Sequence, residues 1–193
     1  QAWYPGEEGG NAVADILYGK VSPSAKLSVS YPNAEVYEPI CYNYSTEKDA
    51  RVAWPFGYGL SYTSFEYDKL DLVQEASTTD EALTIAFEVK NTGAVKADEI
   101  AQVYLSPADG NTNIRPIQLQ GFARVSLAPG ETKRVEVAMH VEQFGYYSNE
   151  EQRQWNIAPG EYTLKVGASS QDIKLSGNIR LQGEKVVKPL REY

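Results

Sequence analysis

Alternation of apolar and polar residues along the chain beyond residue 65 is the feature that most restricts the fold. In the stretch ALTIAFEVKNTG the apolar residues Leu83, Ile85, Phe87 and Val89 fall on one side of an extended chain. Comparable runs occupy residues 100–106, 122–127, 133–139, 162–166 and 173–181. Pro-Gly pairs in LAPGETKRVEV and IAPGEYTLKV suit the central positions of type II turns. Short alternating strands separated by turn signals predict an antiparallel β-sandwich.

The first 64 residues follow a different pattern. Apolar residues recur at helical spacing between residues 8 and 18, after Pro5-Gly6 and before Gly19, which predicts one short helix. The alternation in KLSVSY, residues 26–31, predicts a strand. A helix and a strand must each bury a face against another layer, and together they are too little to close a core. We therefore expect a large exposed apolar face on residues 1–64.

Composition excludes several classes of function. The formal charge of -8 and the absence of any Lys/Arg cluster argue against nucleic acid and anionic membrane as partners. Apolar stretches are too short for a membrane span. The single cysteine, Cys41, excludes an internal disulfide, and the single histidine, His140, leaves a zinc-type site without its usual ligands. No metal and no cofactor is expected.

Glu7 and Glu8 stand side by side in PGEEGG and raise the question of a catalytic carboxylate pair. The helix pattern places them in a first turn, where backbone N–H groups and the helix dipole favour the ionised form. A general acid needs the opposite, a raised pKa. The sequence therefore favours helix-start acids over catalysts.

Two groups of motifs carry a resemblance to a known family. The stretch AWYPGEEGGNAVADILYGKVSPSAKLSVSYP, followed by WPFGYGLSYTSFEY, resembles the end of the second domain of glycoside hydrolase family 3 enzymes, the β-glucosidases and their relatives. The later stretches VKNTGAVKADEIAQVYLS, RPIQLQGFARVSLAPGE and WNIAPGEYTLKVGASS are similar to the fibronectin type III-like domain that follows it. The resemblance implies a mainly β chain: residues 1–64 complete an α/β sandwich domain, 65–181 form an immunoglobulin/fibronectin III-like sandwich, and 182–193 are a tail.

Family membership also implies a retaining mechanism with two carboxyl groups about 5–5.5 Å apart. In the family the nucleophile is an Asp within Ser-Asp-Trp, and the acid/base is a Glu upstream of PGEEGG. No aspartate here precedes a tryptophan, and the Lys-His dipeptide that contacts sugar is missing. The resemblance thus implies a fragment that is inactive alone, whose partners are the N-terminal catalytic domains of the same parent chain. The parent's substrate would be an oligosaccharide or β-glycoside, with glucose favoured and xylose next, in a periplasmic or extracellular setting.

Candidate residues follow from the matching motifs. The resemblance places Trp3 and Glu8 nearest the substrate, with buried packing as the more common role for such a tryptophan. In PFGYGLSYT the aromatic residues join the two domains and the glycines allow close approach. Arg115, on the loop before LQGF, is expected to dock the sandwich onto the catalytic domains. The docking candidates are Phe56, Tyr58, Tyr62 and Arg115.

Other residues favour ordinary roles. We expect hairpin packing rather than a sugar platform at Tyr146, Tyr147 and Trp155, an ordinary imidazole at His140, a small apolar filler at Cys41, a glycosylation sequon at Asn43 and a turn rather than a calcium loop at 109–111. A non-catalytic module that binds carbohydrate or protein remains the alternative function. Neither version of it needs the N-terminal helix and strand.

Overall fold

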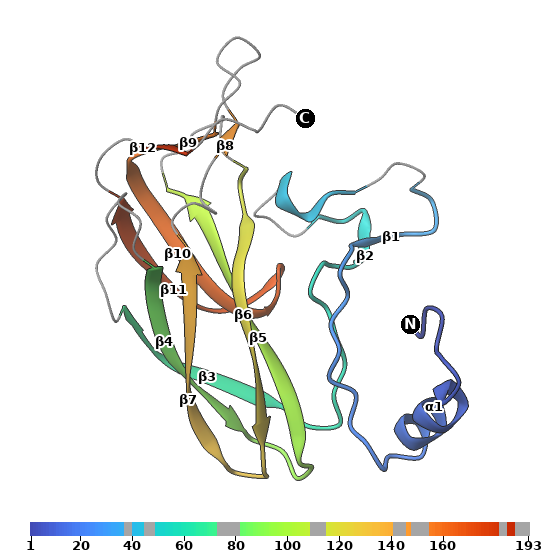
Figure 1. Ribbon diagram of the computed structural model, residues 1–193. Coiled ribbons are helices and arrows are strands. Elements are labelled where there is room, and N and C mark those ends of the chain that lie inside the picture. Colours follow the sequence, from blue (N-terminus) through green and yellow to red (C-terminus); the bar gives the residue numbers. More distant parts are fainter. Residues whose placement is uncertain are drawn as a thin grey trace.

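The computed structural model describes residues 1–36, 40–44, 49–72, 82–108, 115–140, 146–147, 155–181 and 185–187. Over these residues the chain is mainly β, as the alternation predicts (Figure 1). One sheet of the sandwich has the order β3-β4-β7, and the facing sheet has the order β11-β10-β5-β6. The strands are β3 (Phe65–Leu72), β4 (Ala82–Asn91), β5 (Ala97–Pro107), β6 (Gln118–Leu127), β7 (Thr132–His140), β10 (Gly160–Ser169) and β11 (Asp172–Leu181).

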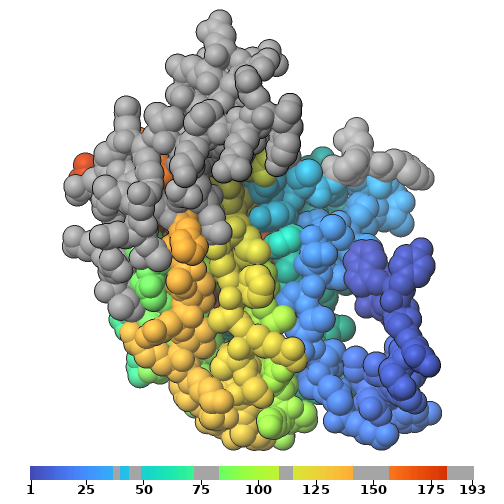
Figure 2. Space-filling model, viewed as in Figure 1, coloured from blue at the N-terminus to red at the C-terminus, as the bar shows by residue number. Residues whose placement is uncertain are grey.

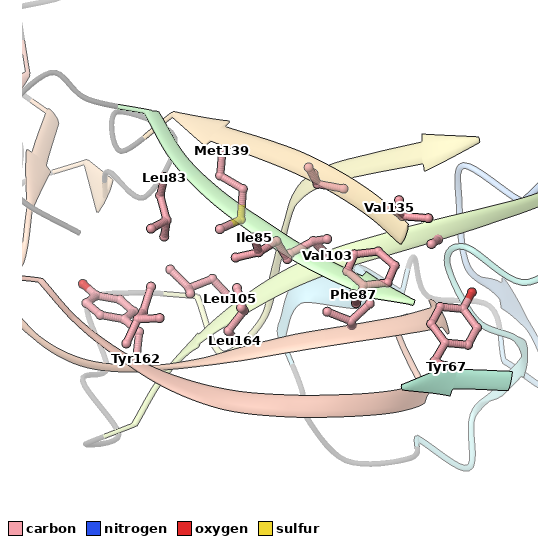
Figure 3. Close-up of a cluster of buried hydrophobic side chains, with 14 of the residues drawn as sticks. Tyr67, Leu83, Ile85, Phe87, Val103, Leu105, Val135, Met139, Tyr162 and Leu164 are labelled. Atoms are coloured by element: carbon pink, nitrogen blue, oxygen red, sulfur yellow. The ribbon is translucent and has the colours of Figure 1, made fainter. Parts of the chain in front are cut away.

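Neighbouring strands pair antiparallel in both sheets, and the inward residues of each strand meet between them. Figure 3 shows Ile85 and Phe87 of β4 pointing toward Val103 and Leu105 of β5. These side chains are almost completely buried. Each such residue contributes about 1.5–3 kcal/mol to folding, so the alternating pattern itself specifies the core.

Shorter elements surround the sandwich. Helix α1 (Gly9–Leu17) opens the chain, and Tyr42–Tyr44 form a 3-10 turn. Two small sheets join β1 (Tyr31–Pro32) with β2 (Val52–Trp54), and β12 (Lys185–Val187) with β9 (Trp155–Ile157) and β8 (Tyr146–Tyr147).

Several local predictions need correction. Residues 26–30 do not form a strand: Leu27 instead exchanges single backbone hydrogen bonds with Gly57 and Tyr58, because its partner is an irregular loop and not a strand. Helix α1 begins at Gly9, so Glu7 and Glu8 precede its first turn. Gly19 has the left-handed φ of 74° expected after a helix.

The two Pro-Gly turns also differ. At the first, Gly130 has φ 76° and the amide of Glu131 donates to the carbonyl of Ala128, as in a tight turn. At the second, Gly160 has φ 148° and is the first residue of β10, so the shared Ala-Pro-Gly-Glu sequence does not produce the same backbone conformation.

Strand β3 contains a bulge. The register with β4 shifts between Asp68 and Asp71, and Lys69 has a positive φ of 54°. The shift turns Leu70 toward the core, where it packs beside Gly177 of β11. The bulge breaks the alternation that would have marked β3 in the sequence.

Asn91 fixes the corner where β4 ends. Its side-chain oxygen accepts hydrogen bonds from Thr63 Oγ1 at 2.6 Å and from the amide of Gly93 at 3.1 Å. Its Nδ2 donates to the carbonyls of Val95 at 2.8 Å and Leu127 at 3.0 Å. The side chain is fully buried, so it replaces water with four protein partners.

Candidate functional site

The N-terminal segment crosses the outer side of the β11-β10-β5-β6 sheet and defines the candidate site, a junction between two parts of the chain (Figure 1). The amide of Leu27 donates to the carbonyl of Tyr58 at 2.8 Å, and the amide of Gly57 donates to the carbonyl of Leu27 at 2.7 Å. The amide of Ser170, after β10, donates to the carbonyl of Phe56 at 3.0 Å. The first two bonds join Leu27 to the loop around PFGYG, and the third joins that loop to the sandwich.

Gln102 of β5 connects the two parts through its side chain. Its Nε2 donates to the carbonyl of Gly57 at 3.0 Å and to that of Ala168 at 2.9 Å. Its Oε1 accepts from the hydroxyl of Tyr104 at 2.6 Å. Gly57 has φ 80°, and a Cβ there would overlap Gln102 Oε1, so glycine is required for both backbone and space.

Aromatic rings close the junction beside this amide. Tyr42 stacks on Phe56 with ring centroids 4.0 Å apart, and it meets Tyr104 edge-on at 6.4 Å. The Tyr42 hydroxyl also accepts a hydrogen bond from the amide of Leu119 on β6 at 3.1 Å. Burial raises the pKa of Tyr104 far above its ordinary value, with a smaller contribution from Tyr42. Tyr104 therefore acts as a neutral hydrogen-bond donor.

A buried ion pair makes a second connection. Lys26 Nζ lies 3.1 Å from Glu99 Oε1 on β5, with side-chain exposures of 12% and 5%. The same oxygen accepts from the Tyr67 hydroxyl at 2.7 Å. Burial first, and then the Glu99 charge, raises the pKa of Tyr67 well beyond its ordinary value. The carboxylate of Glu99 thus has both a cation and a neutral donor.

Helix α1 and the residues before it stand away from the sandwich (Figure 2). No residue of α1 is buried, and the Tyr62 hydroxyl donates to the carbonyl of Ile16 at 2.7 Å. Glu8, at the N-cap position, accepts a hydrogen bond from Asn11 Nδ2 at 2.6 Å and makes no capping bond. Trp3 is 61% exposed and has a positive φ of 50°. The packed environment expected for Trp3 is therefore absent from this chain.

Exposed apolar side chains gather on this part of the molecule, as expected. Of the twelve large apolar residues that are exposed in the described part of the chain, ten lie within residues 1–62. We call these ten the N-terminal apolar face: Trp3, Tyr4, Val13, Leu17, Tyr18, Val21, Val29, Trp54, Leu60 and Tyr62. Exposed large apolar side chains are thus concentrated in the N-terminal segment and are rare on the described part of the sandwich.

The described residues offer little chemistry for catalysis. Glu7 and Glu8 are both exposed, so neither has the burial that would make it a general acid near neutrality. Among the residues that the structure describes, no group of three or more His, Cys, Asp or Glu is placed to hold a metal ion. Within the same residues, no helix is long and apolar enough to cross a membrane.

The docking candidates separate into two groups. Phe56, Tyr58 and Tyr62 all take part in the junction or its link to α1. Arg115 is exposed, and its proposed docking role stays a prediction.

Sequence reasoning missed the two buried residues of the junction, Glu99 and Gln102, and the two half-buried ones, Lys26 and Tyr42. The glycines and aromatic residues of PFGYGLSYT were the signals that something packs there.

The minor candidates have mixed outcomes. Cys41 is exposed and is not an apolar filler, because the loop that carries it runs over the surface. Asn43 is buried, which argues against a glycan on its side chain in the folded chain. His140 is exposed at the end of β7. Tyr147 and Trp155 pair across β8 and β9, as a hairpin interpretation requires of the backbone. Residues 109–111 lie outside the described residues.

The fold and the junction define a class of protein: a fibronectin type III-like sandwich that carries the end of a preceding domain on its outer face. Residues 1–62 match the family model of the glycosyl hydrolase family 3 C-terminal domain, and residues 99–170 match that of the fibronectin type III-like domain. The chain corresponds to the C-terminal part of family 3 glycoside hydrolases.

Comparison with individual relatives gives the same result. A β-glucosidase from Kluyveromyces marxianus is 41% identical over 90% of this chain and 22% of its own length. An exo-α-(1→6)-L-arabinopyranosidase from Bifidobacterium breve is 34% identical over the whole chain and 28% of its own length. The crystal structure of the K. marxianus enzyme with glucose superposes with a TM-score of 0.83 at 38% identity, over 98% of this chain and 24% of that one. The chain spans about a quarter of the length of the curated relatives it matches.

Proposed function

We propose that this chain is the C-terminal part of a retaining β-glycosidase that removes terminal nonreducing β-linked sugars, with glucose as the favoured sugar. In this proposal the chain contributes structure: the sandwich docks and stabilises the catalytic domains, which supply the nucleophile and the acid/base. The chain alone is inactive in this proposal, because the Asp-Trp nucleophile motif and the acid/base upstream of PGEEGG are not in its sequence.

The N-terminal apolar face is the observation that carries the proposal. Helix α1 buries no residue against the sandwich, yet it presents Val13 and Leu17 as an apolar stripe. Such a helix needs a second layer, and in the matching relatives about three quarters of the chain is available to supply one. A stand-alone carbohydrate-binding or adhesive sandwich would have no use for this helix.

Trp3 and Glu8 remain the substrate-proximal candidates. Trp3 precedes α1 and is largely exposed, which leaves its ring available to border a cleft formed with the catalytic domains. One relative is named an arabinopyranosidase, so similarity over this chain does not by itself determine the particular sugar.

The test begins with the codons upstream of Gln1. If they encode an Asp-Trp motif and a second carboxylate, the longer protein should hydrolyse an aryl β-glucoside, while the present chain should show no turnover. An upstream region without such a domain, or turnover by the present chain, would overturn the proposal. In the active longer protein, Trp3→Ala should raise KM, whereas Val95→Ala, which removes an exposed apolar side chain on the sandwich, should leave KM unchanged.

A further inference from the structure

The two halves of the N-terminal segment are held very differently. The described part of residues 22–62 bonds to the sandwich through the carbonyls of Phe56 and Gly57 and through the side chains of Lys26 and Tyr42. The preceding residues contribute α1, which buries nothing and is tied to the rest through the Tyr62 hydroxyl. The change in attachment lies near Val21, about forty residues before the end of the family-model match at residue 62.

Lys26 makes the first of these attachments, an ion pair. Its ammonium reaches Glu99 on the inward-facing side of β5, and the Tyr67 hydroxyl from β3 donates to the same carboxylate oxygen. The Lys26 stem reaches this position because residue 59 is glycine: a Cβ there would lie 2.7 Å from Lys26 Cδ and from the carbonyl oxygen of Ala25. A buried ion pair with this geometry holds its partners in one arrangement, because separation leaves a charge without compensation.

Gln102 makes the second attachment on the opposite face of β5. Its amide is shared between Gly57 of the segment and Ala168 of β10, and Tyr104 fixes its orientation. Lys26 and Gln102 therefore hold the segment on both sides of the same strand. Residues 22–62 cannot leave the sandwich without exposing buried polar groups at both points.

We propose that residues 22–62 and the sandwich form one cooperative structural unit, fastened by a buried latch of Lys26–Glu99–Tyr67 and Gly57–Gln102–Tyr104, and that α1 lies outside this unit. The folding boundary then falls near Val21 rather than between the two family domains. The N-terminal apolar face then divides between α1 with the residues near it, outside this unit, and Val29, Trp54, Leu60 and Tyr62, which belong to it. This inference concerns the present chain and does not depend on glycosidase activity.

Hydrogen exchange on the full chain tests the proposal without any substitution. The amides of Ser170 and Leu119, which donate to the Phe56 carbonyl and the Tyr42 hydroxyl, report the latch. Those of Ala12 and Tyr18 report α1, and those of β4 report the sandwich core. The latch amides should exchange at rates close to those of β4 and at least about a hundredfold more slowly than those of α1. Latch amides that exchange as fast as those of α1 would overturn the proposal.

Variants separate the ion pair from general packing. Lys26→Met should accelerate exchange of the latch amides at least about tenfold, because Glu99 stays buried without its cation. Lys20→Met is the matched control: its ion pair with Asp15 is exposed, at 73% and 40%, and the substitution should change exchange less than about twofold. Protected β4 amides show that each variant is folded.

A double variant tests the origin of the effect. Lys26→Met/Glu99→Gln removes the uncompensated charge while Gln keeps an acceptor for the Tyr67 hydroxyl. Its latch amides should exchange more slowly than those of Lys26→Met. Equal acceleration by Lys26→Met and Lys20→Met, or no recovery in the double variant, would refute the latch as described.

Discussion

Gly57→Ala offers a sharp test of the junction, because Gly130→Ala provides a matched reference. Both glycines have left-handed backbone, with φ of 80° and 76°. A Cβ at residue 130 would meet nothing within 4 Å, whereas a Cβ at residue 57 would overlap Gln102 Oε1. The two substitutions therefore share the backbone strain and differ in what the new methyl group displaces.

The structure gives the size of the difference. Alanine in a left-handed conformation costs about 1–2 kcal/mol. The lower conformational entropy of the unfolded chain offsets about 0.4–1 kcal/mol of this, so Gly130→Ala should destabilise the fold by about 0.5–1 kcal/mol. At residue 57 the Gln102 amide must also move, which removes its bonds to Gly57, Ala168 and Tyr104 at about 1 kcal/mol each. Gly57→Ala should therefore cost about 3–4 kcal/mol in total.

Urea unfolding of the full chain measures both variants, since stability follows from the midpoint when the denaturant slope is unchanged. In thermal melts the extra loss at residue 57 corresponds to a Tm about 6–12 °C below that of Gly130→Ala. If Gly57→Ala lies within about 1 kcal/mol of Gly130→Ala, the Gln102 amide does not hold the junction and the reasoning fails.

Three further predictions rest on single side chains. Asn91→Leu should destabilise the chain by about 3 kcal/mol in urea unfolding, because it removes four buried hydrogen bonds. As a control, Val95→Ala keeps the backbone carbonyl that Asn91 binds and should cost under about 1 kcal/mol. Lys69→Gly should change the free energy of unfolding by less than about 1 kcal/mol, because glycine relieves the positive φ while the exposed ion pair with Glu88 is lost. A larger loss of stability would show that this ion pair contributes more than an exposed pair usually does. Hydrogen bonding from Ser126, and then from Arg124, lowers the pKa of Asp98 below its ordinary 3.8. The ionised carboxylate therefore stabilises the fold above pH 3.8, and this stabilisation is lost as the pH falls through the lower folded pKa. In urea unfolding at a series of pH values, Asp98→Asn should reduce the loss of stability on the acid side.

The core of the sandwich could be predicted from the sequence because its information is local. In β4 and β10 the residues that alternate as apolar become buried, and in β11 Ile179 and Leu181 are buried while Ile173 and Leu175 are half-buried. Strand β3 could not be recognised in the same way, because its bulge at Lys69 breaks the period of two. The short apolar helix was also predictable, since its spacing does not depend on which partner covers it.

The contacts of the junction could be identified only from the tertiary structure. Lys26 sits in an alternating run that predicts a strand, and nothing around it distinguishes it from a surface lysine. Its partner Glu99 is 73 positions away, and Gln102 is 45 positions from the carbonyl of Gly57 that it binds. The alternating pattern by itself determined which faces are buried within each strand, whereas only the folded chain decided which segment lies over β5, because such pairings depend on distant residues that no local period connects.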